Sequence, residues 1–294
     1  AFGYADRFDE KYDLVRSLRK GKYKYMRNYQ PFNVDGLYNF YRYKMLAYKE
    51  WYTLFQDGKL NDIQSQFFKP KSPESLYNIE EDPHETKNLA NDIAYNDVLI
   101  AMREDLNNHL MSINDLSFLP EPYFLKNGID DVVEYSAQNK TLIKKLIETS
   151  NLQLKDYDEV SSQIKNSLND DNPWVRYWGL IVCSSFGSKA MENKDKINVI
   201  FENDSENLVR MRAAEFMLLN DIELSDSKIN SLLRRSNFEA EANLMLNTLA
   251  NIKTINPKYK LNLNKNVFPE NWIPPIREEN ALVNRRMNYL TENE

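Results

Sequence analysis

The sequence predicts an α+β fold: a small antiparallel sheet of about four strands packed with helices, followed by an all-α domain of helical repeats. Residues 12–29 alternate apolar or aromatic with charged positions at a period of two, which is typical of strands with one buried face. Later segments repeat apolar residues every three or four positions, which is typical of amphipathic helices. Three of these segments resemble one another at spacings of 34 and 31 residues, as helical repeats do.

The strands are predicted by alternation and by turn residues. Lys20-Gly21 divides residues 12–29 into the arms of a hairpin, because Gly21 can adopt the positive φ that a tight turn needs. Residues 2–8 and 75–79 can each add a short strand, which brings the sheet to about four. The candidates for packed positions in the hairpin are Leu14, Leu18, Tyr23 and Tyr25.

Helices are predicted between and after these strands. One runs from about Tyr41 to Gly58, where a glycine can end it. A shorter one covers residues 62–68 and ends before Pro70, because the residue ahead of a proline disfavours the αR conformation. A long helix follows Asp92, which can cap its first turn. Its apolar stripe consists of Tyr95, Val98, Leu99, Met102, Leu106, Leu110 and Ile113.

The segment Asp82-Pro83-His84-Glu85 predicts a capping box. Asp82 would accept a hydrogen bond from the amide of Glu85, and the Glu85 carboxylate would reach back. Pro83 fits the first helical position, where no amide hydrogen is needed. We interpret Asp82, Pro83 and Glu85 as a structural cap that fixes the angle between strand and helix, and His84 as a turn residue.

A domain boundary is predicted within residues 115–130, which contain several prolines and lose the helical period. We divide the chain into an α+β domain at 1–122, a helical-repeat domain at 123–255 and an irregular C-terminal tail at 256–294. The tail contains four prolines, so we expect it to be irregular and to lie on the surface of the protein.

The second domain is predicted to consist of stacked helix pairs. Val175, Val209 and Ala240 align in three units that each begin with a polar or acidic turn and continue as an apolar helix. A second amphipathic helix, such as 194–201, separates one unit from the next. One unit cannot bury its apolar face alone, so stacking follows. The alternative is a chance similarity between amphipathic helices.

The composition excludes several classes of protein. The 294 residues carry a net charge of −6, and no apolar run approaches the ~20 residues of a membrane span. Having only 7 glycines argues against Gly-rich nucleotide loops. We expect no nucleic-acid partner and no membrane span.

Residues 1–71 hold 14 Lys and Arg against 8 Asp and Glu. These charges are either solvated or attract anionic ligands. One cysteine excludes an internal disulfide.

We predict no catalytic residue and no metal site in this chain. Cys183 lies in an apolar helical segment, where a thiol behaves as a small hydrophobe. His84 and His109 are too few for a histidine-rich metal site and have no nearby cysteine. The sequence contains no P-loop, dinucleotide fingerprint, nucleophile elbow or EF-hand loop.

Several separated motifs resemble those of the sulfatases. Glu74-x-Leu76-Tyr77 followed by DPHETKNLA at 82–90 is similar to the C-terminal signature of that family, especially of the heparan N-sulfatases, or sulfamidases. YDLVRSLRKGKYKYMRNYQPF at 12–32 resembles the strand pair ahead of this motif. FLPEP at 118–122 resembles the end of that domain in a bacterial branch. The resemblance covers about residues 1–125.

This resemblance implies a fold and a missing partner. Family members have a large α/β domain with the active site and then a smaller domain with a four-stranded antiparallel sheet and a long helix, which residues 1–125 would form. Their chemistry uses calcium and a formylglycine made in a C/S-x-P-S-R type motif to cleave sulfate esters or sulfamates. That motif is not in this sequence, where Ser-Ser-Phe-Gly follows Cys183. We therefore expect an inactive fragment whose partner is its own N-terminal catalytic domain, which would hold both cofactors.

The resemblance also implies a substrate class, a sulfated carbohydrate such as a glycosaminoglycan. Arg7, Asp9, Glu10 and Arg16 are the candidates to reach the rim of the substrate pocket, and the basic excess fits an anionic sugar. Alternatively, these residues form salt bridges between domains. Family habit implies a periplasmic or secreted location.

Two other functions stay open. The repeats resemble HEAT-type helical arrays, which bind partners or brace neighbouring domains, so the chain could be a non-enzymatic interaction module that uses them as its binding surface. It could also belong to another hydrolase of the alkaline phosphatase superfamily with a similar small domain. The reading frame upstream of Ala1 would distinguish these possibilities.

Overall fold

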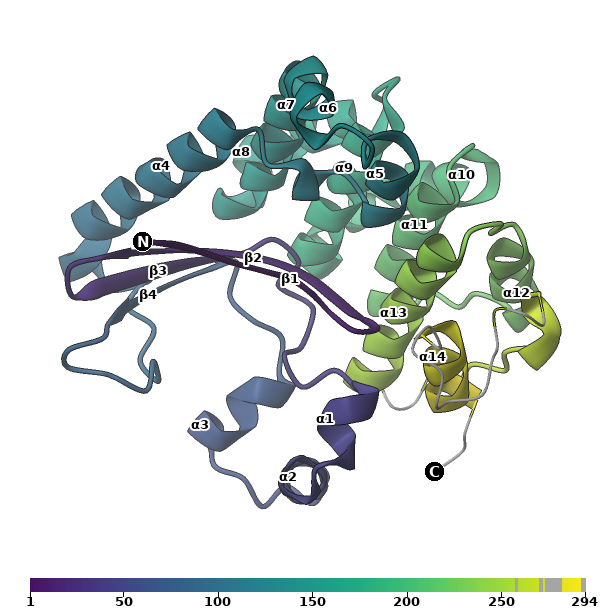
Figure 1. Cartoon of the computed structure of the whole chain (residues 1–294), viewed down its shortest axis with the longest axis horizontal. Coiled ribbons are helices and arrows are strands. Elements are labelled where there is room, and N and C mark those ends of the chain that lie inside the picture. Colours follow the sequence, from purple (N-terminus) through teal and green to yellow (C-terminus); the bar gives the residue numbers. More distant parts are fainter. Residues whose placement is uncertain (257–258, 270–271, 273–281, 292–294) are drawn as a thin grey trace.

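The computed structural model describes residues 1–256, 259–269, 272 and 282–291. An antiparallel sheet lies beside a long helix, and the later helices continue from that helix in an arc (Figure 1). This arrangement confirms the predicted α+β class with a helical domain. None of the described helices is both long and apolar enough to cross a membrane.

The sheet has four antiparallel strands in the order β1-β2-β3-β4, which confirms the predicted hairpin and the two added strands. Gly21 turns between β2 and β3 with a φ of 60°. Leu18 pairs with Phe2 on one side and with Tyr25 on the other, and Tyr25 pairs with Leu76. The bounds are β1 Phe2–Phe8, β2 Lys11–Lys20, β3 Tyr23–Asn28 and β4 Glu74–Asn78.

The two faces of the sheet differ in burial, because successive side chains of a strand point to opposite faces. One face is packed against helices and carries Leu14, Leu18, Tyr25 and Leu76, all buried. Tyr23, also expected at a packed position, is half-buried. The opposite face, which we call the open sheet face, carries Ala5, Val15, Ser17 and Met26, which are exposed or half-buried.

The helix expected from Tyr41 is interrupted at Met45, whose extended conformation separates α1 (Phe40–Lys44) from α2 (Leu46–Gln56). Neither helix contains a buried residue. The short helices expected at 62–68 are present as α3 (Asp62–Ser65) and η1 (Gln66–Phe68). Figure 1 shows α1 to α3 together on one side of the sheet, away from the arc of helices.

The long helix is α4 (Asn96–Ile113), which follows η2 (Ile93–Tyr95). Asp92 caps η2 by accepting a hydrogen bond from the Ala94 amide. Four residues of the predicted stripe are buried, but Ile113 at its end is exposed. The buried residues are Leu99, Met102, Leu106 and Leu110.

The second half of the chain is helical. Helices α9, α11 and α13, which carry Val175, Val209 and Ala240, pack side by side, and α8 and α10 pack against α9 and α11. The helix pairs therefore stack as expected, while their assignment to the HEAT type stays a prediction. The bounds are α5 Glu121–Asn127, α6 Val132–Gln138, α7 Lys140–Ser150, α8 Tyr157–Leu168, α9 Pro173–Phe186, α10 Lys194–Asn203, α11 Asn207–Leu219, α12 Asp226–Arg234 and α13 Glu239–Ile255, with short 3-10 helices η3 Leu116–Phe118, η4 Asn151–Leu154, η5 Gly187–Asn193 and η6 Lys265–Val267.

The sheet and the later helices share one apolar core, and buried hydrogen bonds join them. The Tyr12 amide donates to Asn247 Oδ1 on α13 at 3.0 Å. Arg212 Nη2 on α11 donates to Gln30 Oε1, which follows β3, at 2.9 Å. The boundary near residue 122 stays a prediction, but we expect the two parts to unfold together.

The prediction of an irregular tail is wrong for its last part, which contains α14 (Leu282–Thr291). Val283, Met287 and Leu290 are buried, and α14 packs against α13. Their helical spacing was hidden by the four nearby prolines, of which Pro257, Pro274 and Pro275 lie outside the described residues. The buried guanidinium of Arg286 donates to the carbonyls of Glu10 and Tyr38, which ties α14 to the sheet.

Candidate functional site

The four candidate substrate residues lie at one end of the sheet, in or next to the β1-β2 hairpin. Asp9 forms the turn in a left-handed conformation, with a φ of 50°. Arg7 is on β1 and Arg16 on β2. The structure therefore brings these residues to one region, but it gives them different environments.

Glu10 and Arg16 are buried and have partners within the chain. Glu10 Oε1 accepts a hydrogen bond from the Phe40 amide at 2.6 Å. Arg16 Nε donates to Asp115 Oδ2 at 2.6 Å, and its Nη1 donates to Asp6 Oδ1. Burial opposes the charge of Arg16, but both carboxylates outweigh it and raise its pKa. These two residues therefore hold the hairpin in place.

Arg7 is more exposed and lines a pocket. Its Nη1 lies 3.5 Å from the Tyr12 hydroxyl and 3.5 Å from Glu121 Oε1 on α5. Burial opposes its charge, but the bond to Tyr12 and the negative field of Glu121 and Asp9 keep its pKa above the ordinary value. Arg7 is therefore the predicted residue best placed to contact a ligand.

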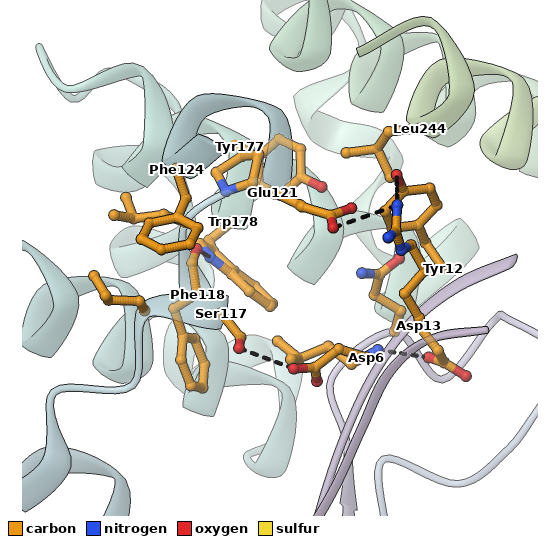
Figure 2. Close-up of a pocket in the computed structure, with 16 residues that line it drawn as sticks. Asp6, Tyr12, Asp13, Ser117, Phe118, Glu121, Phe124, Tyr177, Trp178 and Leu244 are labelled. Carbon is orange, nitrogen blue, oxygen red and sulfur yellow. Dashed lines mark hydrogen bonds and ion pairs between the residues drawn. The ribbon is translucent and has the colours of Figure 1, made fainter. Parts of the chain in front are cut away.

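The pocket has a volume of about 250 Å³ and lies where β1 and β2 meet η3, α5, α9 and α13. Figure 2 shows aromatic side chains from η3, α5 and α9 on one side and Tyr12 and Leu244 on the other. Asp6 lies at the lower edge, where it accepts a hydrogen bond from Ser117 Oγ at 2.9 Å. The aromatic residues are Phe118, Phe124, Tyr177 and Trp178.

Tyr12 and Asp13, which also line the pocket, have shifted pKa values as well. Burial raises the pKa of Tyr12 to about 12, and the nearby Glu121 carboxylate acts in the same direction, so the phenol keeps its proton at neutral pH. Burial alone would raise the pKa of Asp13, but the attraction of Lys71 and Lys11 holds it below the ordinary value. Lys71 Nζ lies 2.6 Å from Asp13 Oδ2.

We expect Asp13→Asn to lower the stability at neutral pH and to remove part of its acid dependence. Because the folded pKa of Asp13 lies below that of the unfolded chain, its contribution is complete above about pH 5 and is lost as the pH falls through about 4 and below. Urea unfolding at several pH values measures this difference. Asp62→Asn, at a fully exposed side chain, is the control and should follow the unchanged protein. Parallel pH curves for Asp13→Asn and the unchanged protein would contradict the assignment.

The predicted capping box is wrong. No helix begins at Pro83 in the structure; the chain forms turns there, and Glu85 has a left-handed φ of 53°. Asp82 Oδ2 accepts a hydrogen bond from the Lys87 amide, and its Oδ1 accepts one from the Thr86 hydroxyl. Glu85 instead pairs with Lys24 on β3 at 2.7 Å. The ion pair to the sheet and the left-handed backbone replace the helical turn that the box requires.

The described residues contain no group of three or more His, Cys, Asp or Glu side chains placed to hold a metal ion. Cys183 is buried in α9, and burial raises the pKa of its thiol to about 12, as expected for a core residue. It is followed by Ser-Ser-Phe-Gly, which does not fit a formylglycine precursor.

Sequence patterns did not reveal Glu121, Ser117 or Trp178 as part of the site. They are separated from Arg7 by more than a hundred residues, and none stands in a motif of its own. The stretch that contains Glu121 was singled out only because FLPEP resembles the end of the smaller domain of sulfatases. These side chains come from η3, α5 and α9, which meet β1 and β2 around the pocket.

The chain is similar to a sulfatase. It is 36% identical over 169 residues to a protein described as an ulvan-active sulfatase, from Formosa agariphila, and the match covers 57% of this chain and 24% of that protein. The chain thus spans about a quarter of the length of this curated relative. No protein-family model and no solved structure matches it. The chain therefore contains a sulfatase-related region.

Proposed function

We propose that this chain is the C-terminal part of a sulfatase that hydrolyses sulfate esters or sulfamates of carbohydrates, with its catalytic domain outside these 294 residues. The observation that carries the proposal is the 36% identity to a sulfatase about four times longer than the match. The small sheet with its long helix agrees with the lobe that the sulfatase-like motifs imply. Calcium and formylglycine would belong to the catalytic domain.

The open sheet face is the surface that would contact that domain. Its half-buried apolar residues, Val15 and Met26, lie on a sheet whose other face is already packed. Apolar side chains on an otherwise uncovered sheet face are typical of a surface that a partner covers. A catalytic domain of the same polypeptide is the partner that the proposal requires.

Arg7 and Asp9 would contribute to the rim of the substrate site from the hairpin turn. Glu10 and Arg16 would hold that turn through their bonds to Phe40, Asp6 and Asp115. The helical array would brace the hairpin, since Asn247 and Arg286 both bond to it. The substrate would be a sulfated glycan; glycosaminoglycans and ulvan, which the relative's name specifies, are the first candidates.

An assay of sulfate release tests the proposal. We expect the polypeptide encoded by the complete gene to release sulfate from an aryl sulfate, N-sulfoglucosamine or ulvan, and this chain alone to release none. The control is the complete polypeptide with the Cys or Ser of its C/S-x-P-S-R motif replaced by alanine, which should be inactive. Turnover by this chain alone would overturn the proposal. A gene without that motif would instead favour the interaction module built on helical repeats.

A further inference from the structure

The pocket beside the hairpin offers one polar corner with unused hydrogen-bonding capacity. Most polar groups around the pocket are already paired. Trp178 Nε1 donates to the Phe118 carbonyl at 2.8 Å, and the Tyr177 hydroxyl accepts from Arg212 at 2.8 Å. Asp6 accepts from Arg16 and Ser117. Each of these groups therefore already has a partner within the chain.

Arg7, Tyr12 and Glu121 form the corner that remains. Both contacts of Arg7 Nη1 are long, at 3.5 Å, which is the outer limit of a hydrogen bond. The Glu121 side chain is 30% exposed, and its Oε1 has this long contact with Arg7, while its Oε2 is buried out of reach of solvent. Because this contact is so long, the Glu121 carboxylate can still accept a hydrogen bond from a ligand.

The charges of this corner favour an uncharged ligand. The guanidinium of Arg7 and the carboxylate of Glu121 balance each other, while Asp6 at the lower edge shares Arg16 with Asp115. A free anion would meet two carboxylates, and a cation would meet Arg7. A pair of neighbouring hydroxyl groups fits both partners, because each hydroxyl can donate to Glu121 or accept from Arg7.

The rest of the pocket suits one apolar face of a ring. Phe124 lines the pocket and is half-buried, so part of its surface is open to a ligand. Figure 2 shows it on the same side as Trp178, across from Tyr12. The volume of about 250 Å³ is below the roughly 300–1,000 Å³ of pockets for drug-sized ligands. The pocket therefore has room for about one sugar-sized ring.

We propose that this pocket binds an uncharged pyranose unit of a polysaccharide, with two neighbouring hydroxyl groups between Glu121 and Arg7 and one ring face on Phe124. This inference rests on the proposed function for the carbohydrate class. It does not need the catalytic domain, because every residue of the pocket is in this chain. Binding and sulfate release can therefore fail independently.

Saturation-transfer NMR on the 294-residue chain tests this binding with five probes. They are the methyl pyranosides of glucose, galactose, mannose, xylose and rhamnose, and sodium sulfate is the anionic comparison. We expect at least one pyranoside to bind, and Glu121→Gln to weaken it about tenfold or more, because a bond to a charged acceptor is lost. Arg7→Gln should have a similar effect.

Glu50→Gln on α2 is the matched control, since Glu50 is exposed and lies at least 20 residues along the chain from every pocket residue. Thermal unfolding establishes that each variant is folded, and both Glu121 and Arg7 are exposed enough to be replaced without loss of core packing. The proposal is overturned if none of the five pyranosides binds, if Glu121→Gln and Arg7→Gln bind like the unchanged chain, or if sulfate binds more tightly than every pyranoside.

Discussion

Replacing Trp178 with alanine should lower the free energy of unfolding by about 3–5 kcal/mol, the usual loss for a large aromatic side chain removed from a core. Trp178 is 1% exposed. Its ring packs against Tyr29, which follows β3, and against Phe118 of η3, with centroids 6.1 and 5.4 Å away. The indole also donates to the Phe118 carbonyl, which would be left without this donor. One side chain thus joins the sheet to the helical array.

Urea unfolding followed by far-UV circular dichroism measures this loss. We expect a single transition in both proteins, shifted to lower urea in the variant, because the two halves share their core. The control is Trp51→Ala, since Trp51 lies on α2, where no residue is buried. It should have the smaller effect. If Trp178→Ala loses no more than Trp51→Ala, or if only the helical half shifts in a second transition, the shared core is wrong.

Replacing Arg212 alone with methionine should be about as severe, near 3–5 kcal/mol, because it leaves the buried Glu215 carboxylate without its partner. Arg212 and Glu215 are 3% and 1% exposed, and Arg212 Nη1 lies 2.8 Å from Glu215 Oε2. Arg212 also donates to Gln30 and Tyr177, so the change would remove the donor to the Tyr177 hydroxyl and one of the two donors to Gln30 Oε1, which also accepts from Asn33. Replacing both Arg212 and Glu215 with methionine should recover much of the loss, since no buried charge remains.

The same unfolding measurement compares the single and double variants. Lys144→Met is the control, because Lys144 pairs with Glu148 on the exposed side of α7 and such pairs contribute little. A loss for Arg212→Met no larger than for Lys144→Met would mean that the pair is not buried as described. A double variant that is less stable than the single one would contradict the role of the lone carboxylate.

Local sequence signals predicted the sheet well. The alternation of Leu14, Leu18 and Tyr25 and the glycine at position 21 depend only on neighbouring residues, and the structure has all four in those places. The capping box failed, although its residues were correct, because Glu85 pairs with Lys24 on a strand sixty residues earlier. Tertiary contacts overrode a local preference there.

The pocket could not be predicted for a related reason. Arg7 and Glu121 meet only because α5 packs at the end of the sheet, and Arg16 meets Asp115 across 99 residues. Single charged residues at such distances leave no periodic pattern. The buried Arg286 of α14 was not predicted, because the prolines near this helix concealed the helical spacing of Val283, Met287 and Leu290.

Hydroxyl-radical footprinting of Met26 tests most directly whether the open sheet face is covered by a catalytic domain. Met26 is half-buried on that face, and Met191 in η5, also half-buried, is the internal reference on the helical array. In the polypeptide encoded by the complete gene, Met26 should be oxidised more slowly than in this chain alone, while Met191 is oxidised at the same rate in both. Equal oxidation of Met26 in the two proteins would contradict the account.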